Sequence, residues 1–173
     1  MVAKHEASEE VREFSEKVVK IRRVAKVVKG GRHLSFNALV VVGDGHGNVG
    51  VGLGKADSVP DAIRKGTNIA RKNVVAVLLR GRTIPHRAQA KYGAAIVLIK
   101  PASLGTGIIA GGVSRAVLEL AGVKDVVCKS LKSGNPINVA GATFQALRGL
   151  RVVEQEQALR KGEAPKEKPP APA

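Results

Sequence analysis

Seven positively charged side chains occur within sixteen residues near the start of the chain, and their chemistry is suited to binding phosphates. They are Lys17, Lys20, Arg22, Arg23, Lys26, Lys29 and Arg32, and no acid lies among them. Lysine neutralises a phosphate as a point charge, and arginine also forms paired hydrogen bonds with it. Edge strands use lysines to prevent aggregation, but seven uncompensated charges exceed that need. We therefore expect this segment to bind a polyanion.

The same cations alternate with β-branched residues at a period near two, which favours a strand over a helix. The β-branched residues are Val18, Val19, Ile21, Val24, Val27 and Val28. Gly30 and Gly31 follow, and a second strand is predicted from 34 to 42. Because glycine adopts positive φ and lets another backbone approach closely, the pattern predicts a hairpin with a basic, accessible tip.

A third strand, predicted from 49 to 55, carries three glycines on one face. Gly50, Gly52 and Gly54 leave that face bare. Either a ligand or a closely packed element is expected to approach the strand there.

A helix from about 58 to 73 completes the first predicted unit. Ser58 and Asp61 have the spacing of a capping box, which indicates the start of a helix. We expect its inward face to consist of Ala62, Ile63, Gly66, Ile69 and Ala70.

Further strands and helices are predicted in the second half, which indicates an α+β fold. Strands are expected at 74–79, 84–90, 92–100 and 126–130, helices at about 113–121 and 135–150, and a glycine-rich segment at 105–112. The predicted regions are a mobile acidic tail (1–15), a β-β-β-α domain with a basic, polyanion-binding hairpin (16–74), a second α+β domain (75–150) and a charged, proline-rich, disordered tail (151–173).

Residues that could catalyse a reaction or bind a metal are scattered. The histidines are His5, His33, His46 and His86, and the acids between positions 17 and 150 are Asp44, Asp57, Asp61, Glu119 and Asp125. Neither set has the spacing of a metal site or of a paired acid and base. The single cysteine, Cys128, fits a reducing compartment, and no apolar run approaches the length of a membrane-spanning helix. We expect no catalytic site, no metal, no cofactor and a cytoplasmic location.

One segment invites a nucleotide-binding interpretation. The pattern Gly105-x-Gly107-x-x-Ala110 follows a predicted strand and precedes a predicted helix, as in dinucleotide-binding folds. Those folds also place an acid at the end of the second strand, whereas Asp125 precedes the strand here. We therefore favour a tight glycine turn used for packing or for contact with a partner.

The distribution of charge points to folded RNA. Between residues 17 and 150 there are 22 Lys and Arg against five acids, a net charge of +17. Proteins that bind single strands by stacking need aromatic platforms, and aromatic residues make up only 2% of this chain. Cations and bare glycine backbone suit phosphates and the shape of folded RNA instead.

Several long motifs resemble the bacterial small-subunit ribosomal protein S-five family. They are RRVAKVVKGGR (22–32), SFNALVVVGDG (35–45), GLGKA (52–56), VPDAI-x-K (59–65), GTGIIAGG (105–112) and NPINV (135–139). Together they cover roughly residues 15–150. Ala25 departs from the family pattern, since many relatives carry serine there.

The resemblance implies an N-terminal unit related to double-stranded-RNA-binding domains and a second α+β domain with a left-handed βαβ crossover. It also implies a structural constituent of the small ribosomal subunit that binds ribosomal RNA and supports subunit assembly and translational accuracy. The implied partners are ribosomal RNA, the ribosomal proteins S-four and S-eight, and messenger RNA near its entrance channel, with no membrane and no small-molecule substrate. The hairpin tip, from Lys26 to Arg32, is expected to lie against ribosomal RNA near the spectinomycin site.

The candidate site residues follow from the residues and the resemblance together. The RNA-binding candidates are Lys20, Arg22, Arg23, Lys26, Lys29, Gly30, Gly31, Arg32, Lys55, Arg64, Arg71 and Lys72. The resemblance places the S-four interface at Gly105, Gly107 and Arg115. Two alternatives are a free-standing double-stranded-RNA-binding regulator, which leaves the second domain unexplained, and a nucleotide-dependent enzyme, which lacks the required acid.

Overall fold

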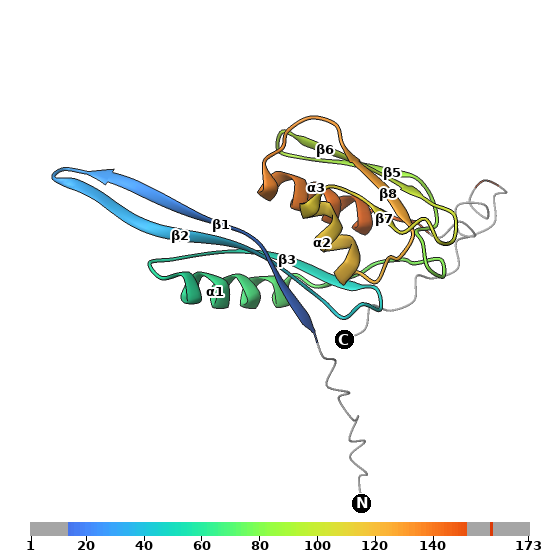
Figure 1. The fold of residues 1–173 in the computed structure, drawn as a ribbon, viewed down its shortest axis with the longest axis horizontal. Helices are drawn as coiled ribbons and strands as arrows, with labels where there is room; N and C mark the ends of the chain where they lie inside the picture. Colours follow the sequence, from blue (N-terminus) through green and yellow to red (C-terminus); the bar gives the residue numbers. More distant parts are fainter. Residues whose placement is uncertain (1–13, 152–159, 161–173) are drawn as a thin grey trace, which may run out of the picture.

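The computed structural model describes residues 14–151 and residue 160, so the predicted tails lie almost entirely outside the described residues. Its first half is an antiparallel sheet in the order β1-β2-β3-β4 (Figure 1). The strands are β1 (Ser15–Val28), β2 (Gly31–Gly43), β3 (Asn48–Ala56) and β4 (Val75–Ala76). Helix α1 (Val59–Lys72) follows β3. The predicted hairpin, third strand and helix are confirmed, and the short β4, inside the strand predicted at 74–79, joins the same sheet.

The bare face of β3 is covered by α1, so the packing alternative is the correct one. A Cβ atom added to Gly50, Gly52 or Gly54 would lie less than 3.0 Å from backbone carbonyl oxygens of α1. Only glycine lets the helix backbone approach this closely. The face therefore has no room for a ligand.

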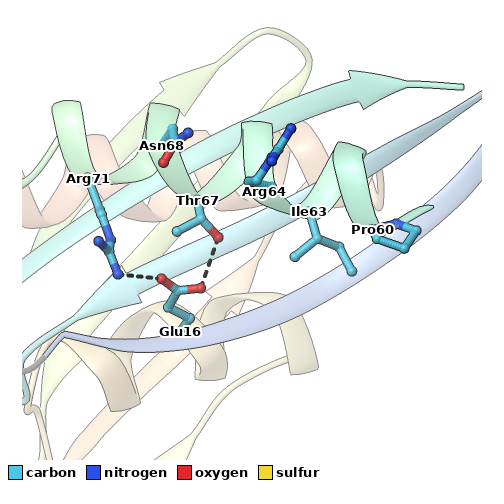
Figure 2. A pocket seen from close by; sticks show the side chains of 7 residues that line it. All are labelled: Glu16, Pro60, Ile63, Arg64, Thr67, Asn68 and Arg71. Carbon is cyan, nitrogen blue, oxygen red and sulfur yellow. Dashed lines mark hydrogen bonds and ion pairs between the residues drawn. The ribbon is translucent and has the colours of Figure 1, made fainter. Parts of the chain in front are cut away.

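Helix α1 begins as predicted, because the Ser58 hydroxyl accepts a hydrogen bond from the Asp61 N–H. One inward assignment was wrong: the Ile69 side chain is 40% exposed, whereas Thr67 is 7% exposed. Thr67 lies on the same helical face as Gly66 and Ala70, and its hydroxyl donates to Glu16 on β1 at 3.0 Å. Figure 2 shows this carboxylate held between Thr67 and Arg71, whose Nη2 lies 2.8 Å from Oε1.

The second half forms a mixed sheet in the order β5-β6-β8-β7. Its strands are β5 (Ala88–Tyr92), β6 (Ala95–Pro101), β7 (Ile108–Ile109) and β8 (Val126–Ser130). The helices are α2 (Gly112–Leu120) and α3 (Pro136–Arg148). β7 and β8 are parallel neighbours joined through α2, which gives the expected βαβ connection. The α+β fold is thus confirmed, while the left-handedness of the crossover stays a prediction.

Two predicted strands between the halves of the chain are shorter in the structure or begin later. Of residues 74–79 only Val75 and Ala76 pair, and the strand predicted at 84–90 begins only at Ala88. Pro85 has no N–H to contribute to a ladder, so the chain cannot extend a strand through it. The strand predicted at 92–100 is also divided, because Gly93 turns the chain at a φ of 55°.

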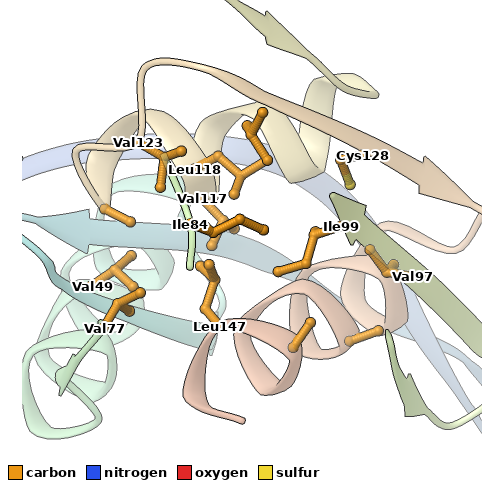
Figure 3. Packing of buried hydrophobic residues seen from close by; sticks show 14 of the residues in the cluster. Val49, Val77, Ile84, Val97, Ile99, Val117, Leu118, Val123, Cys128 and Leu147 are labelled. Atoms are coloured by element: carbon orange, nitrogen blue, oxygen red, sulfur yellow. The ribbon is translucent and has the colours of Figure 1, made fainter. Parts of the chain in front are cut away.

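The elements stack in four layers: α1, the first sheet, the pair α2 and α3, and the second sheet (Figure 1). One hydrophobic core joins the last three layers. Val49 of the first sheet packs in the same cluster as Leu118 of α2, Leu147 of α3 and Ile99 of the second sheet (Figure 3). The two sheets therefore share their core, and the boundary predicted between 74 and 75 stays a prediction; β4, which follows it, pairs with β3 of the first sheet.

Two smaller observations complete the fold. Cys128 is buried in this core as a free thiol, and burial raises the pKa of that thiol. Of the described helices, none is long and apolar enough to cross a membrane.

Candidate nucleic-acid interface

The β1–β2 hairpin extends well beyond the rest of the sheet. β3 ends at Ala56, opposite Phe36, and beyond that point β1 and β2 pair only with each other. This two-stranded extension, residues 24–35, is called the arm below. It runs for five residue pairs, from Val24 opposite Ser35 to Val28 opposite Gly31, or roughly 17 Å. Figure 1 shows the arm projecting away from the layered body.

The tip of the arm is open backbone. Lys29 and Gly30 form the turn, and Gly30 has a φ of 94°, a conformation that favours glycine. No atom lies within 4 Å of the position that a Cβ would occupy at Gly30 or Gly31. The positive φ at position 30 favours glycine there, and the space beside Gly30 and Gly31 is open to another molecule.

Cations lie on both faces of the arm and of its base. Directly opposite residues in a sheet share a face. Arg22 lies opposite Asn37, which lies opposite Lys55, so these two cations share one face. Lys20 and Lys26 lie on that face too, at even spacing along β1, whereas Arg23 and Arg32 lie on the other face. All of these cations are exposed.

The cations of the arm and its base are electrostatically uncompensated. In the described part of the chain, no acid lies within 4.0 Å of Lys20, Arg22, Arg23, Lys26, Lys29, Arg32 or Lys55. Lys17, at the start of β1, differs because its Nζ lies 2.7 Å from Glu119 on α2. The positive potential therefore rises toward the tip, which is the part free to reach a polyanion.

The structure separates three of the twelve RNA-binding candidates from the rest. Arg64, Arg71 and Lys72 are exposed on α1, which covers the face of the first sheet opposite to Lys20 and Lys55. Two of them are paired internally: Arg71 with Glu16 at 2.8 Å and Arg64 with Asp61 at 3.4 Å. The other nine candidates lie together along the arm and its base.

The glycine-rich segment is shaped by a buried carboxylate that the sequence analysis did not assign to it. Asp125 is 1% exposed, and its Oδ1 accepts hydrogen bonds from Gly105 N at 3.1 Å and from Gly107 N at 2.9 Å. Its Oδ2 accepts from Arg82 Nε at 3.2 Å. In a dinucleotide site the backbone N–H groups of the glycine turn bind phosphate. Here the chain's own carboxylate occupies them.

The outer surface of this segment is accessible. Gly105 and Gly107 have φ values of 87° and 74°, and no atom lies within 4 Å of a Cβ at either. Arg115 is exposed and donates from Nη2 to the Ile108 carbonyl at 3.0 Å. These glycines are thus required by the turn, and close packing does not explain them.

Two models of known protein families match the chain in succession. The first, described as ribosomal protein S5, N-terminal domain, matches residues 14–78. The second, described as ribosomal protein S5, C-terminal domain, matches residues 90–160.

The chain belongs to the ribosomal protein S5 family. This is the S-five family that the sequence motifs resemble, and its members are structural, RNA-binding components of the small ribosomal subunit, which acts in translation in the cytoplasm. Both family domains are present in order, and their α+β folds are the two halves seen in the structure. The chain is therefore a structural component, not an enzyme.

No group of three or more His, Cys, Asp or Glu among the described residues could hold a metal ion. The nucleotide-binding alternative fails for a physical reason. The N–H groups of Gly105 and Gly107, which a phosphate would need, already donate hydrogen bonds to Asp125 Oδ1.

Asp125 and Arg82 are the positioning residues that sequence reasoning missed. The available signal was that Asp125 is the only acid between Glu119 and Leu150, in a strongly basic chain. The hydrogen bond from Gly107 lowers the pKa of Asp125, and the Arg82 guanidinium adds to this effect against the opposing effect of burial. The carboxylate is therefore held ionised as an anchor for the turn.

We expect Asp125→Asn to destabilise the protein at pH 7 and to have a smaller effect in acid. The folded-state pKa lies below its ordinary value of 3.8. The stabilisation is therefore present above about pH 4 and is lost as the pH falls through the folded-state pKa. Thermal midpoints measured from pH 7 to about pH 2 should show the gap between wild type and variant closing.

The matched control is Asp57→Asn, which makes the same atomic change in an exposed carboxylate. Its midpoint at pH 7 should stay close to that of wild type. A gap between Asp125→Asn and wild type that stayed constant over the whole pH range would contradict an ionised anchor.

Proposed function

We propose that this chain binds small-subunit ribosomal RNA chiefly through the arm and its base, and that it thereby supports subunit assembly and translational accuracy. The observation that carries the proposal is the set of exposed cations without acidic partners on a projecting ribbon. A ribbon with cations on both faces can contact phosphates on two sides when it is inserted between RNA segments. The open tip at Gly30 and Gly31 lets RNA come close to Lys29 and Arg32.

The cations on α1 have a secondary role in this proposal. Arg71 is already paired with Glu16, so RNA would have to compete with an internal ion pair at 2.8 Å. Lys72 has no such partner in the described residues. Of the three candidates on α1, Lys72 and a partly neutralised Arg64 would therefore be the more available to a second RNA segment.

The glycine segment is proposed as the contact with the ribosomal protein S-four, through Gly105, Gly107 and Arg115. A loop whose backbone is fixed by Asp125 loses little entropy on binding, which favours protein contact. Leu104, 81% exposed, adds an apolar side chain beside it. Contacts with S-eight and with messenger RNA near its entrance channel belong to the same proposal and rest on the family resemblance alone.

A free-standing double-stranded-RNA-binding regulator is the less favoured function. Such a protein needs only the first sheet and α1, yet Val41 and Val49 of that sheet are fully buried in the core shared with the second half. A separated first half would expose them to water. The two halves are therefore built to function as one body.

Salt dependence tests the electrostatic basis of the proposal. If six cations each neutralise one phosphate, affinity for small-subunit ribosomal RNA should fall roughly 10³-fold between about 50 and 200 mM salt. The measurement is a filter-binding or fluorescence titration of the full chain at several salt concentrations. A dissociation constant that changed less than about threefold over this range would overturn the proposal.

A further inference from the structure

The face of the first sheet that carries α1 is covered only in part. Helix α1 packs on the glycines of β3, and residues directly opposite one another in a sheet share a face. The register therefore places Glu16, Val18 and Ile21 of β1 on the same face as α1. The residues of β2 opposite to them are fully buried, whereas Val18 is 40% and Ile21 is 41% exposed. The helix thus leaves the β1 side of this face open.

A groove of about 510 Å³ lies beside α1 on this open side (Figure 2). It is lined by Glu16 of β1 and by one side of the helix, which contributes Pro60, Ile63, Arg64, Thr67, Asn68 and Arg71. The lining combines the apolar Pro60 and Ile63 with the exposed guanidinium groups of Arg64 and Arg71. Such a lining suits a partner that has an apolar side with carboxylates next to it.

The described part of the chain begins at one end of this groove. Phe14 packs against the apolar cluster between α1 and the sheet. Two residues later, the carboxylate of Glu16 lies 2.8 Å from Arg71 Nη2 and accepts a hydrogen bond from Thr67 at 3.0 Å. The chain therefore enters the groove with one apolar and one acidic contact, and residues 1–13 lead directly into them.

The residues before Phe14 have the pattern that this lining requires. Four apolar residues recur at spacings of four, four and three, which is the period of one helical face: Ala3, Ala7, Val11 and Phe14. At 100° per residue, one flank of that stripe collects all four glutamates of the segment, Glu6, Glu9, Glu10 and Glu13. Thirteen residues of helix span roughly 20 Å, and the groove follows α1 from Pro60 to Arg71, or roughly 17 Å. Length, apolar period and charge all match the groove.

We propose that residues 1–13 bind back into the groove between β1 and α1. Their apolar stripe covers Val18, Ile21 and Ile63, and their glutamates face the arginines of α1. RNA does not suit the groove, because its centre is apolar and Glu16 already supplies a carboxylate there. A second copy would bring a strongly basic body against two arginines. The N-terminal segment is acidic, and its attachment at the end of the groove gives it a high effective concentration.

The docked segment determines which cations remain for RNA. Glutamates beside Arg64 and Arg71 neutralise the α1 side of the first sheet and leave the arm as the uncompensated cationic surface. This consequence rests on the proposed RNA-binding function, whereas the docking itself does not. The docking is therefore tested without RNA, so that the two proposals can fail separately.

The test is paramagnetic relaxation in the full chain, free in solution. A nitroxide is attached at Asn68→Cys, an exposed position in the groove lining, and should strongly broaden the amide resonances of residues 1–13. The same label at Lys91→Cys, on the second sheet across the molecule from α1, should leave them sharp (Figure 1). Wild type treated with the reagent controls for labelling of the buried Cys128. Sharp resonances for residues 1–13 with the Asn68→Cys label would overturn the proposal.

A mixing experiment separates docking within one chain from binding between two copies. Labelled Asn68→Cys without isotope enrichment is mixed with enriched, unlabelled wild type, and we expect no broadening of residues 1–13. Broadening in this mixture would show that the segment occupies the groove of a second copy. That result would overturn docking within the chain.

Neutral glutamines test the role of the carboxylates. The variant combines Glu9→Gln, Glu10→Gln and Glu13→Gln, and the control makes the same change in net charge with Glu154→Gln, Glu156→Gln and Glu163→Gln. Losing three exposed ion pairs should lower the docking equilibrium constant about tenfold, with a matching loss of broadening, and the control should keep the broadening of wild type. Equal broadening in variant and control would show that the glutamates do not hold the segment, and would overturn the proposal.

Discussion

Gly52→Ala is expected to lower the free energy of unfolding by about 3–5 kcal/mol, because the added methyl group has no space. A Cβ at Gly52 would meet the Gly66 carbonyl oxygen and the Ala70 backbone nitrogen of α1. These are backbone atoms held by helical hydrogen bonds, so they cannot move aside as a flexible side chain could. The whole helix would have to move away from the sheet, which would open the cluster of Ala38, Val40 and Ala62.

The matched control for this substitution is Gly134→Ala. No atom lies within 4 Å of a Cβ at Gly134, and its φ is not in the left-handed region, so its stability should be close to that of wild type. Thermal or urea unfolding of the two variants measures the difference, and we expect a drop in midpoint of roughly 10 °C for Gly52→Ala. Equal midpoints would mean that α1 does not pack on β3 as closely as the structure shows.

The elements with a clear period or a distinct signal were predictable from the sequence. The β-branched residues among the cations of β1 predicted a strand, and Ser58 with Asp61 predicted the start of α1. The segment between the two sheets was not predictable, because residues 74–79 are apolar enough for a strand but lack a partner along most of their length. Ile69 was misplaced because the buried face of α1 includes the polar Thr67, whose hydroxyl is satisfied by Glu16 on β1, whereas the prediction placed only apolar residues there.

The part of the candidate interface that depends only on the positions of charged residues in the sequence was predictable. The cations of the arm, Lys26, Lys29 and Arg32, are close together in the sequence, so the hairpin alone brings them close together in space. The internal pairing of Arg71 depends on a residue 55 positions away, and the anchoring of Gly107 depends on one 18 positions away. Whether a charged residue faces a partner or an internal acid is decided by tertiary structure.

Removing all three cations of the arm should nearly abolish RNA binding while leaving the fold intact. The variant is Lys26→Ala with Lys29→Ala and Arg32→Ala. Each charge-assisted contact with phosphate contributes about 1–3 kcal/mol, so the combined loss is at least about a hundredfold in affinity. These side chains are exposed and have no acidic partner among the described residues, so the thermal midpoint should change little.

The mechanism of that loss can be separated from a general effect of net charge. Arg80→Ala with Lys124→Ala and Lys132→Ala removes the same charge from exposed positions outside the proposed interface. If each cation of the arm neutralises one phosphate, the arm variant should reduce the slope of log affinity against log salt by about 3, and the control should leave it nearly unchanged. Titrations with small-subunit ribosomal RNA at several salt concentrations measure both slopes. If the arm variant and the control variant gave equal slopes, the cations of the arm would not contact phosphates directly. They would then act only through the net charge of the molecule.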